Sequence, residues 1–280
     1  MEVKAIRDLA QLSDHDLFIQ VSTGLRLVAK NVAKLYEGTS VLAEQGRLHA
    51  GRVLATIAEE EAAKYLILMD AVRCPRQPSK TLAVQLQRFN QHLAKGLYAK
   101  AGMYRPTTLE QLQEYVDLDR KEFYLDGPNG VDWIYRNEVI DGRESTFYVD
   151  YVRHDDGHRW AEPTEFEDLL FGASEPAAVQ MVRCLQGAGM STTEALATIA
   201  ELWRANPIGS ETHCTEIFAL NRRTLELMES RGQLAEQPPE TYQSIVRDWQ
   251  FPMYGLDLPM VDVDLETLRE RQRNWSPEDY

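Results

Sequence analysis

The sequence predicts a mainly α fold: an antiparallel helical bundle with a small β-hairpin element and additional C-terminal helices. Long stretches carry apolar residues at helical spacing, short breaks separate them, and a single region is rich in aromatic residues and turn formers. Long helices joined by short breaks pack as antiparallel neighbours, which is the arrangement of a bundle. The chain has 280 residues, 44% of them hydrophobic, so it can bury a sizeable core.

Helix boundaries are predicted from capping and breaking residues. Ser13 is followed by acidic residues and is expected to cap the first helix. Gly38, Thr39 and Ser40 are expected to end it, and Cys74-Pro75 is expected to end the second helix. The four expected helices run from Ser13 to Glu37, from about Ser40 to Arg73, from Ser79 to about Lys100 and from Thr108 to about Arg120.

The region of residues 121–160 is predicted to contain the hairpin element. It holds short runs of aromatic and β-branched residues, separated by turn formers that include Asp141-Gly142. The strands or extended hairpin arms expected there are Phe123–Leu125, Val131–Tyr135 and Thr146–Val149. Helical periodicity returns after this region, and an acidic tail follows from Pro252. The later helices are expected at Pro163–Leu170, Glu175–Gln186, Ser191–Ala205, Thr212–Arg231 and Thr241–Trp249.

Charge is distributed unevenly along the chain. The net charge is −14, but residues 1–105 carry +5 and residues 106–280 carry −19. Phosphate binding depends on clustered lysine and arginine, so the first part is the better candidate for contact with a polyanion. The acidic part either suits a basic partner or simply keeps the protein in solution.

The composition also bears on compartment and cofactors. No run approaches the roughly 20 apolar residues of a membrane span, and the charged N-terminus lacks a signal-peptide core. The prediction is a cytoplasmic protein that does not bind a membrane. No cofactor or metal is predicted, because the cysteines lack the paired spacing of zinc sites. His154, Asp155, Asp156 and His158 are a weaker metal candidate, since Asp-Asp-Gly is ordinary turn chemistry.

The second expected helix carries the candidate site residues Glu60, Glu61 and Lys64. Glu60 and Lys64 are i,i+4 neighbours, and Glu61 and Lys64 are i,i+3 neighbours. Glu61 falls on the apolar stripe that includes Tyr65, so its carboxylate is expected to point between helices. A buried charge needs a partner. We therefore predict an interhelical polar cluster, which is either structural or catalytic.

The third expected helix carries a guanidinium, an imidazole and an ammonium group. Arg88, His92 and Lys95 stand at i, i+4 and i+7, which places them along one face of a continuous helix. Cations hold phosphate, and histidine titrates near neutral pH and transfers protons. The pattern is compatible with phosphodiester chemistry, or with a histidine that only hydrogen-bonds between helices.

Three stretches together resemble the AbiV family of abortive-infection proteins. They are the helical run from Leu27 to Leu68 with Glu60-Glu61-x-x-Lys64, the segment Arg88-Phe-Asn-Gln-His92-x-x-Lys95, and Phe147-Tyr-Val-Asp150 followed by Gly157, Trp160 and Pro163. The resemblance covers roughly residues 20–200. It implies the HEPN superfamily of helical domains, which often form homodimers and in active members cleave RNA without metal. Those members have four to six residues between Arg and His, whereas three separate Arg88 from His92.

The resemblance also implies a division of the chain. Residues 12–205 are expected to form the AbiV/HEPN-like helical domain, with a β-hairpin insert near residues 121–160. Residues 206–280 are expected to form an acidic C-terminal helical extension that packs on it.

The functional prediction is an anti-phage abortive-infection effector, a toxin acting as a metal-independent endoribonuclease that halts translation or growth. His92 is the expected general acid or base, Arg88 and Lys95 the charge-stabilising cations, and Glu60, Glu61 and Lys64 the orienting group. The expected partners are RNA, a phage-encoded or host translation-related protein, and a second copy of the chain. The alternative is a non-catalytic helical interaction protein that senses or blocks a phage or ribosomal partner.

Overall fold

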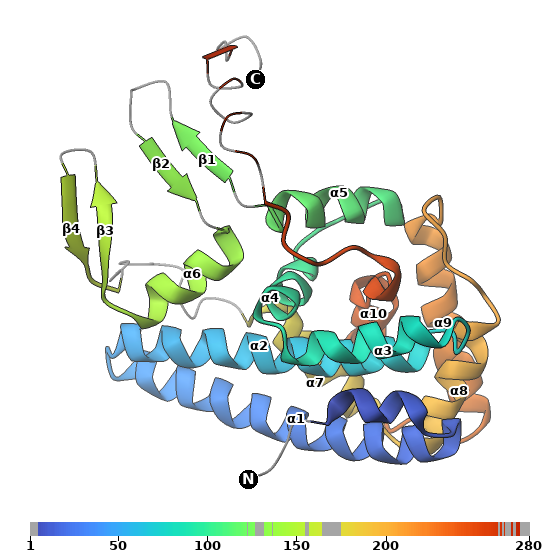
Figure 1. The fold of residues 1–280 in the computed structure, drawn as a ribbon. Coiled ribbons are helices and arrows are strands. Elements are labelled where there is room, and N and C mark those ends of the chain that lie inside the picture. Colours follow the sequence, from blue (N-terminus) through green and yellow to red (C-terminus); the bar gives the residue numbers. More distant parts are fainter. Residues whose placement is uncertain are drawn as a thin grey trace.

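Two long antiparallel helices, α1 (Asp14–Glu44) and α2 (Leu48–Arg73), form one side of a helical bundle (Figure 1). The computed structural model describes residues 5–121, 123–126, 132–135, 137–154, 157–163 and 175–262, with residues 264, 266, 270, 273 and 274. The other bundle helices are α3 (Ser79–Gln87), α4 (His92–Ala101), α5 (Leu109–Asp119), α7 (Ala177–Gly187), α8 (Thr193–Arg204), α9 (Cys214–Ser230) and α10 (Pro239–Asp248). The predicted mainly α class is confirmed.

Helix α1 is longer than predicted, because it passes through Gly38, Thr39 and Ser40 without a break. The hydroxyl of Thr39 donates to the carbonyl of Leu35, so it bonds within the helix and does not interrupt it. Gly38 lies against Leu54 of α2, where a Cβ atom would come within 3.0 Å of the leucine Cδ1. This glycine therefore allows a close approach of two helices and does not mark an end.

The predicted helix from Ser79 to Lys100 is divided in two. Helix α3 ends at Gln87, residues Arg88–Asn90 form one 3-10 turn, and Gln91 has an extended backbone before α4 begins at His92. The i, i+4, i+7 spacing therefore does not place Arg88 on the same face as His92, because it assumes an unbroken helix.

Two short hairpins and an unpredicted helix occupy the region of residues 123–161. Strands β1 (Phe123–Asp126) and β2 (Asp132–Tyr135) pair antiparallel, as do β3 (Asp150–His154) and β4 (Gly157–Ala161). Helix α6 (Glu138–Phe147) lies between the hairpins and contains the expected turn at Asp141-Gly142 and the first part of the expected strand Thr146–Val149. The buried Asn137 begins this helix, accepting from the backbone N–H groups of Val139 and Ile140.

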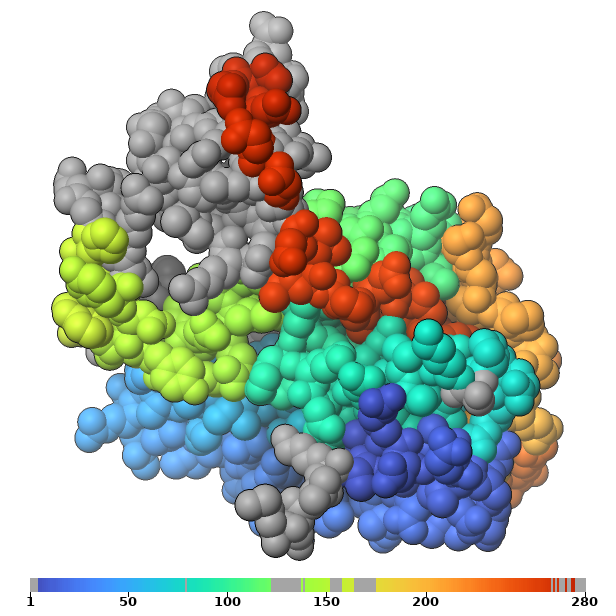
Figure 2. All heavy atoms as spheres, in the orientation of Figure 1, coloured from blue at the N-terminus to red at the C-terminus, as the bar shows by residue number. Residues whose placement is uncertain are grey.

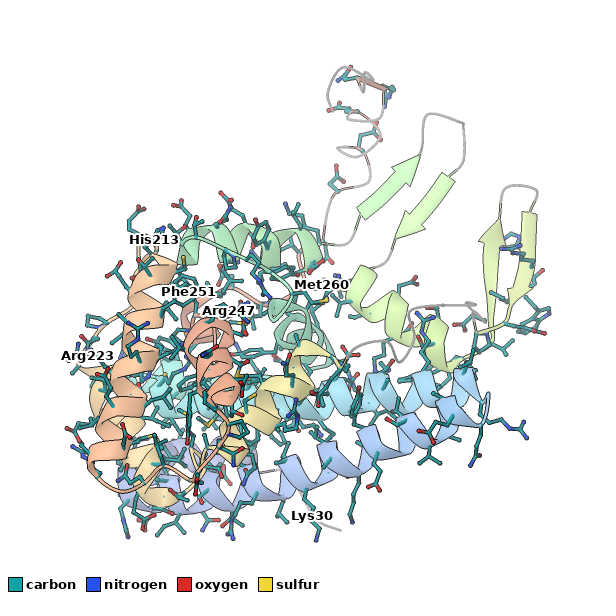
Figure 3. All side chains as sticks on the ribbon, turned by 180° about the vertical axis from the view of Figure 1, so that it is seen from behind. Lys30, His213, Arg223, Arg247, Phe251 and Met260 are labelled. Atoms are coloured by element: carbon teal, nitrogen blue, oxygen red, sulfur yellow. The ribbon has the colours of Figure 1, made fainter. Side chains whose placement is uncertain are left out.

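The helices predicted near the C-terminus correspond to α7, α8, α9 and α10, which pack at one end of the bundle (Figure 1). Figure 3 shows this end from behind, with the buried Phe251 inside it and the exposed Lys30 pointing away from α1. The helix expected at Pro163–Leu170 lies mostly outside the described residues. Among the helices that the structure describes, none is long and apolar enough to span a membrane.

A C-terminal strap, residues 250–261, crosses the bundle between α4 and α5 (Figure 2). A buried network holds it: Asp70 pairs with Arg73 and accepts from the backbone N–H of Met253 at 2.7 Å. The guanidinium of Arg73 stacks on Trp203 and Trp249, at 4.5 and 4.4 Å from their ring centroids. The strap is therefore part of the core of the protein.

Candidate functional site

The carboxylate of Glu60 on α2 is the centre of a polar cluster between α2, α4 and α6. Its Oε2 atom lies 2.5 Å from Nζ of Lys95, and its Oε1 atom lies 2.5 Å from Nε of Arg143. The Nδ1 atom of His92 lies 3.3 Å from Oε2 and 3.4 Å from Oε1. One carboxylate thus contacts an ammonium group, a guanidinium group and an imidazole ring. These four residues, Glu60, His92, Lys95 and Arg143, are called the Glu60 cluster.

Burial differs sharply within the Glu60 cluster. The side chain of Lys95 is 6% exposed and that of Glu60 is 16% exposed, whereas His92 is 54% exposed. Burial raises the pKa of the Glu60 carboxyl, but the hydrogen bonds and charges of Lys95 and Arg143 outweigh it and hold the pKa below 4.5. Glu60 therefore stays ionised at neutral pH, and the cluster carries a net positive charge.

The imidazole of His92 is positioned by this carboxylate. Because Nδ1 faces Glu60, the other ring nitrogen, Nε2, is on the far side of a ring that is more than half exposed. A carboxylate at one ring nitrogen favours the tautomer that carries its proton there and leaves the second nitrogen as a base. The pair is therefore suited to proton transfer at the protein surface.

Glu61 and Lys64 are adjacent to the cluster but do not join it. They form an ion pair with each other along α2, both partly exposed. The ammonium of Lys64 also lies 5.4 Å from the ring centroid of Phe89. Glu61 was predicted to point between helices, but its ion pair is with Lys64 of its own helix, and Glu60 makes the contacts to α4 and α6.

Arg88 lies elsewhere, in the core beneath the C-terminal strap. Its guanidinium donates to the side chain of Gln85 at 2.8 Å and to the backbone carbonyls of Met253 and Leu256 at 2.7 and 2.5 Å. With 5% of its surface exposed, it holds the strap and does not face His92. The predicted set of six residues is thus brought together only in part.

Arg143 is the site residue that the sequence did not indicate. Helix α6 carries it, and the buried Asn137 fixes the start of α6 by donating to the carbonyl of Asp119 at the end of α5. Gly96 of α4 packs directly against Val139 of α6, so the two helices are in close contact. The guanidinium of Arg143 also lies 4.8 Å from the ring centroid of Phe147.

Glu59, the neighbour of Glu60 on α2, has a different environment. No described residue donates a hydrogen bond to its half-buried carboxyl. Burial raises the pKa of this carboxyl from 4.5 to about 7. Two adjacent glutamates on one helix thus have pKa values shifted in opposite directions, because among the described residues only Glu60 has cationic partners.

Within the part of the chain that the structure describes, no three His, Cys, Asp or Glu side chains gather so as to hold a metal ion. Asp155 and Asp156 lie outside the described residues, as do the side-chain contacts of His154.

Comparison with known proteins agrees with the resemblance noted in the sequence. The family model HEPN_AbiV, described as AbiV, matches residues 20–169, a range that contains the whole Glu60 cluster. No curated protein and no solved structure gives a significant match. Because the family match extends over more than half of the 280 residues, the chain belongs to the HEPN_AbiV family of AbiV-type abortive-infection proteins.

Proposed function

We propose that the protein is an abortive-infection effector that cleaves RNA at the Glu60 cluster without a metal. Family membership supports the abortive-infection role. The observation that supports the chemistry is the contact of His92 with Glu60 beside two cations, which joins a proton-transfer group to an anion-binding charge.

In the proposed reaction, Nε2 of His92 takes the proton of a ribose 2′-hydroxyl. The 2′-oxygen attacks the adjoining phosphorus, the bond from phosphorus to the 5′-oxygen breaks, and that oxygen takes a proton from water. The imidazolium of His92 then gives its proton to the hydroxide that remains, which restores the neutral ring. The products carry a 2′,3′-cyclic phosphate and a 5′-hydroxyl. Glu60 orients the imidazole through its contact with Nδ1, as the carboxylate does in a Ser-His-Asp triad.

In this proposal, Arg143 has the charge-stabilising role that was predicted for Arg88. It lies on the same carboxylate as His92 and is a quarter exposed, so its remaining N–H groups can bind a phosphate oxygen. Lys95 is nearly buried and contributes chiefly its charge. Glu60 neutralises one of these two cations, and the other charge remains to attract the substrate.

The test is cleavage of a single-stranded RNA by the purified full-length protein in the presence of EDTA. His92→Ala is expected to lower the rate by about 100-fold or more, the range of general acid–base catalysis. Arg143→Ala is expected to lower it by about 10-fold to 1000-fold, as for removal of one charge-stabilising donor. Mass spectrometry of the products is expected to find cyclic phosphate ends.

His15→Ala is the matched control, because His15 is an exposed histidine on α1 away from the cluster. It is expected to cleave RNA as fast as the parent. An His92→Ala variant that also degrades RNA at the parent rate would remove His92 from the mechanism.

A non-catalytic interaction protein is the second candidate. It is favoured by the three hydrogen bonds that Arg88 makes in the core and by the near burial of Lys95, because both features are typical of structural residues. Under this alternative, cells expressing the His92→Ala variant remain growth-inhibited, and charge reversal in the acidic part of the chain, residues 106–280, abolishes the inhibition. Under the ribonuclease proposal, His92→Ala alone relieves it.

A further inference from the structure

Three aromatic rings gather on one face of the β3–β4 hairpin. Tyr151 of β3 pairs across the hairpin with Trp160 of β4, and His158 lies two residues before Trp160 on the same face. The ring of Tyr151 stacks on that of His158, with centroids 5.7 Å apart and an interplanar angle of 19°, and lies 5.2 Å from the ring of Trp160. This set is called the aromatic platform below.

The aromatic platform is open to solvent. Trp160 is 69% exposed and Tyr151 is 60% exposed, and the neighbouring Tyr148 and Val149 are also more than half exposed. Large apolar side chains gathered in this way on a soluble protein commonly mark a binding surface. The hairpin extends from the bundle beyond α6 (Figure 1).

A chain of contacts leads from the Glu60 cluster to Tyr148, three residues before the platform residue Tyr151. Arg143 binds Glu60 and lies over the ring of Phe147, and Phe147 packs edge-on against Tyr148 with centroids 6.0 Å apart. Tyr148 is followed three residues later by Tyr151, a distance of roughly 10 Å along extended backbone. A single strand that has one phosphate at Arg143 therefore has its next nucleotides within reach of the platform.

We propose that the aromatic platform binds unpaired bases of RNA by stacking and so presents a single strand to the Glu60 cluster. This inference rests on the proposed function, because it names the substrate class of that site. Unpaired bases stack on exposed tyrosine, tryptophan and histidine rings, whereas bases within a duplex are covered by their neighbours.

The composition of the platform favours bases over a polypeptide partner. Its exposed surface is made of aromatic rings, with Val149 as the single aliphatic side chain among the large apolar residues described on this hairpin. Each ring also carries a polar atom that can contact a base edge: a hydroxyl on Tyr151, ring nitrogens on His158 and an indole N–H on Trp160. Arg143 at the origin of the chain of contacts supplies a cation for the backbone phosphate.

The experiment measures binding separately from cleavage. Full-length His92→Ala protein is titrated into a fluorescein-labelled single-stranded oligouridylate of about ten nucleotides, within the range that single-strand sites cover, and Kd is read from anisotropy. Adding Tyr151→Ala or Trp160→Ala is expected to raise Kd by about 5-fold to 100-fold, the effect of losing one stacked base. Trp160→Phe is expected to keep most of the affinity.

Two controls separate stacking from general adhesion. Leu118→Ala removes an equally exposed side chain from α5 and is expected to leave Kd unchanged. An abasic oligomer with the same number of phosphates is expected to bind weakly, and equally to the parent and to Trp160→Ala. Circular dichroism spectra are expected to be identical, since the replaced rings are exposed.

The outcomes distinguish this inference from the proposed function. Binding that depends on Tyr151 and Trp160 supports the platform even if the parent protein cleaves no RNA, in which case only the nuclease proposal fails. Any of three results overturns the platform proposal. They are an unchanged Kd in both variants, tight binding of the abasic oligomer, and no binding of the oligouridylate by the His92→Ala protein. A surface for a second copy is indicated instead if sedimentation finds that Trp160→Ala dissociates a dimer while Kd is unchanged.

Discussion

The Oε1 atom of Glu60 and the Nε atom of Arg143 lie 2.5 Å apart, although 83 positions separate the two residues in the chain. This contact ties α6, which leads into the β3–β4 hairpin, to the centre of α2. It also places a guanidinium on the carboxylate that holds His92. The geometry of the candidate site therefore depends on the position of α6 relative to α2.

Glu60→Gln is expected to destabilise the protein by about 3 kcal/mol at pH 7, as for removal of one partner of a buried ion pair. The neutral amide leaves the charge of Lys95, which is 6% exposed, without compensation. Urea unfolding of parent and variant measures the difference.

The pH dependence of this effect has a defined sign. The folded state lowers the pKa of Glu60 below 4.5, so its contribution is present above the unfolded pKa and is lost as pH falls through the folded pKa. The difference in free energy of unfolding between the parent and Glu60→Gln should therefore become smaller below pH 4.5.

Glu61→Gln is the control. It is expected to lower the free energy of unfolding by less than about 1 kcal/mol, because the ion pair of Glu61 with Lys64 is partly exposed. Equal losses in the two variants would contradict a special role for Glu60.

Arg88→Ala is expected to destabilise the protein by about 2–4 kcal/mol, since two strap carbonyls and one amide oxygen lose a charged donor in the core. The loss should be accompanied by faster amide hydrogen exchange at Met253 and Leu256. Arg222→Ala, which replaces an exposed arginine on α9, should change neither measurement. Unaltered exchange in the strap would show that Arg88 does not anchor it.

Glu59→Gln is expected to stabilise the protein above neutral pH. The folded state raises the pKa of Glu59 to about 7, so the native protein binds the proton more tightly and loses stability as pH rises from 4.5 to about 7. The glutamine avoids this loss. At pH 8, Glu59→Gln should raise the free energy of unfolding by at most about 3 kcal/mol. The increase is smaller to the extent that the half-buried side chain remains hydrated.

Unfolding of Glu59→Gln at pH 5 and pH 8 measures this effect, with Glu110→Gln on the exposed face of α5 as the control. The control should be neutral at both pH values. If Glu59→Gln raised the free energy of unfolding as much at pH 5 as at pH 8, titration of the Glu59 carboxyl would be ruled out as the cause.

Gly96→Ala is expected to displace α6 and with it Arg143. The added Cβ would lie 2.0 Å from Cγ1 of Val139 but 3.5 Å from its Cβ, so the clash depends on the valine branch. Overpacking of this kind costs about 1–3 kcal/mol. Val139→Ala in the Gly96→Ala background should restore part of the stability and any RNA cleavage, and a double-mutant cycle measures this coupling. Additive effects of the two changes would argue against a close packing of α4 on α6.

The helical class and the location of most helices follow from local features of the sequence. Helical periodicity and capping are properties of neighbouring residues, so α5 and α7 to α10 were predicted close to their observed bounds. The family resemblance was likewise carried by local motifs and was confirmed over residues 20–169. Glu60, His92 and Lys95 could be nominated because each stands in such a motif.

Which of these groups come into contact depends on the packing of distant segments. Arg88 bonds to carbonyls that lie 165 and 168 positions away, and the helix break that follows it has no counterpart in the apolar periodicity. Helix α6 begins at Asn137, whose side chain also binds the end of α5, so a segment with the composition of a turn became the helix that carries Arg143. Contacts between residues far apart in the chain fix such features, because a buried charge or amide is stable only where distant partners satisfy it.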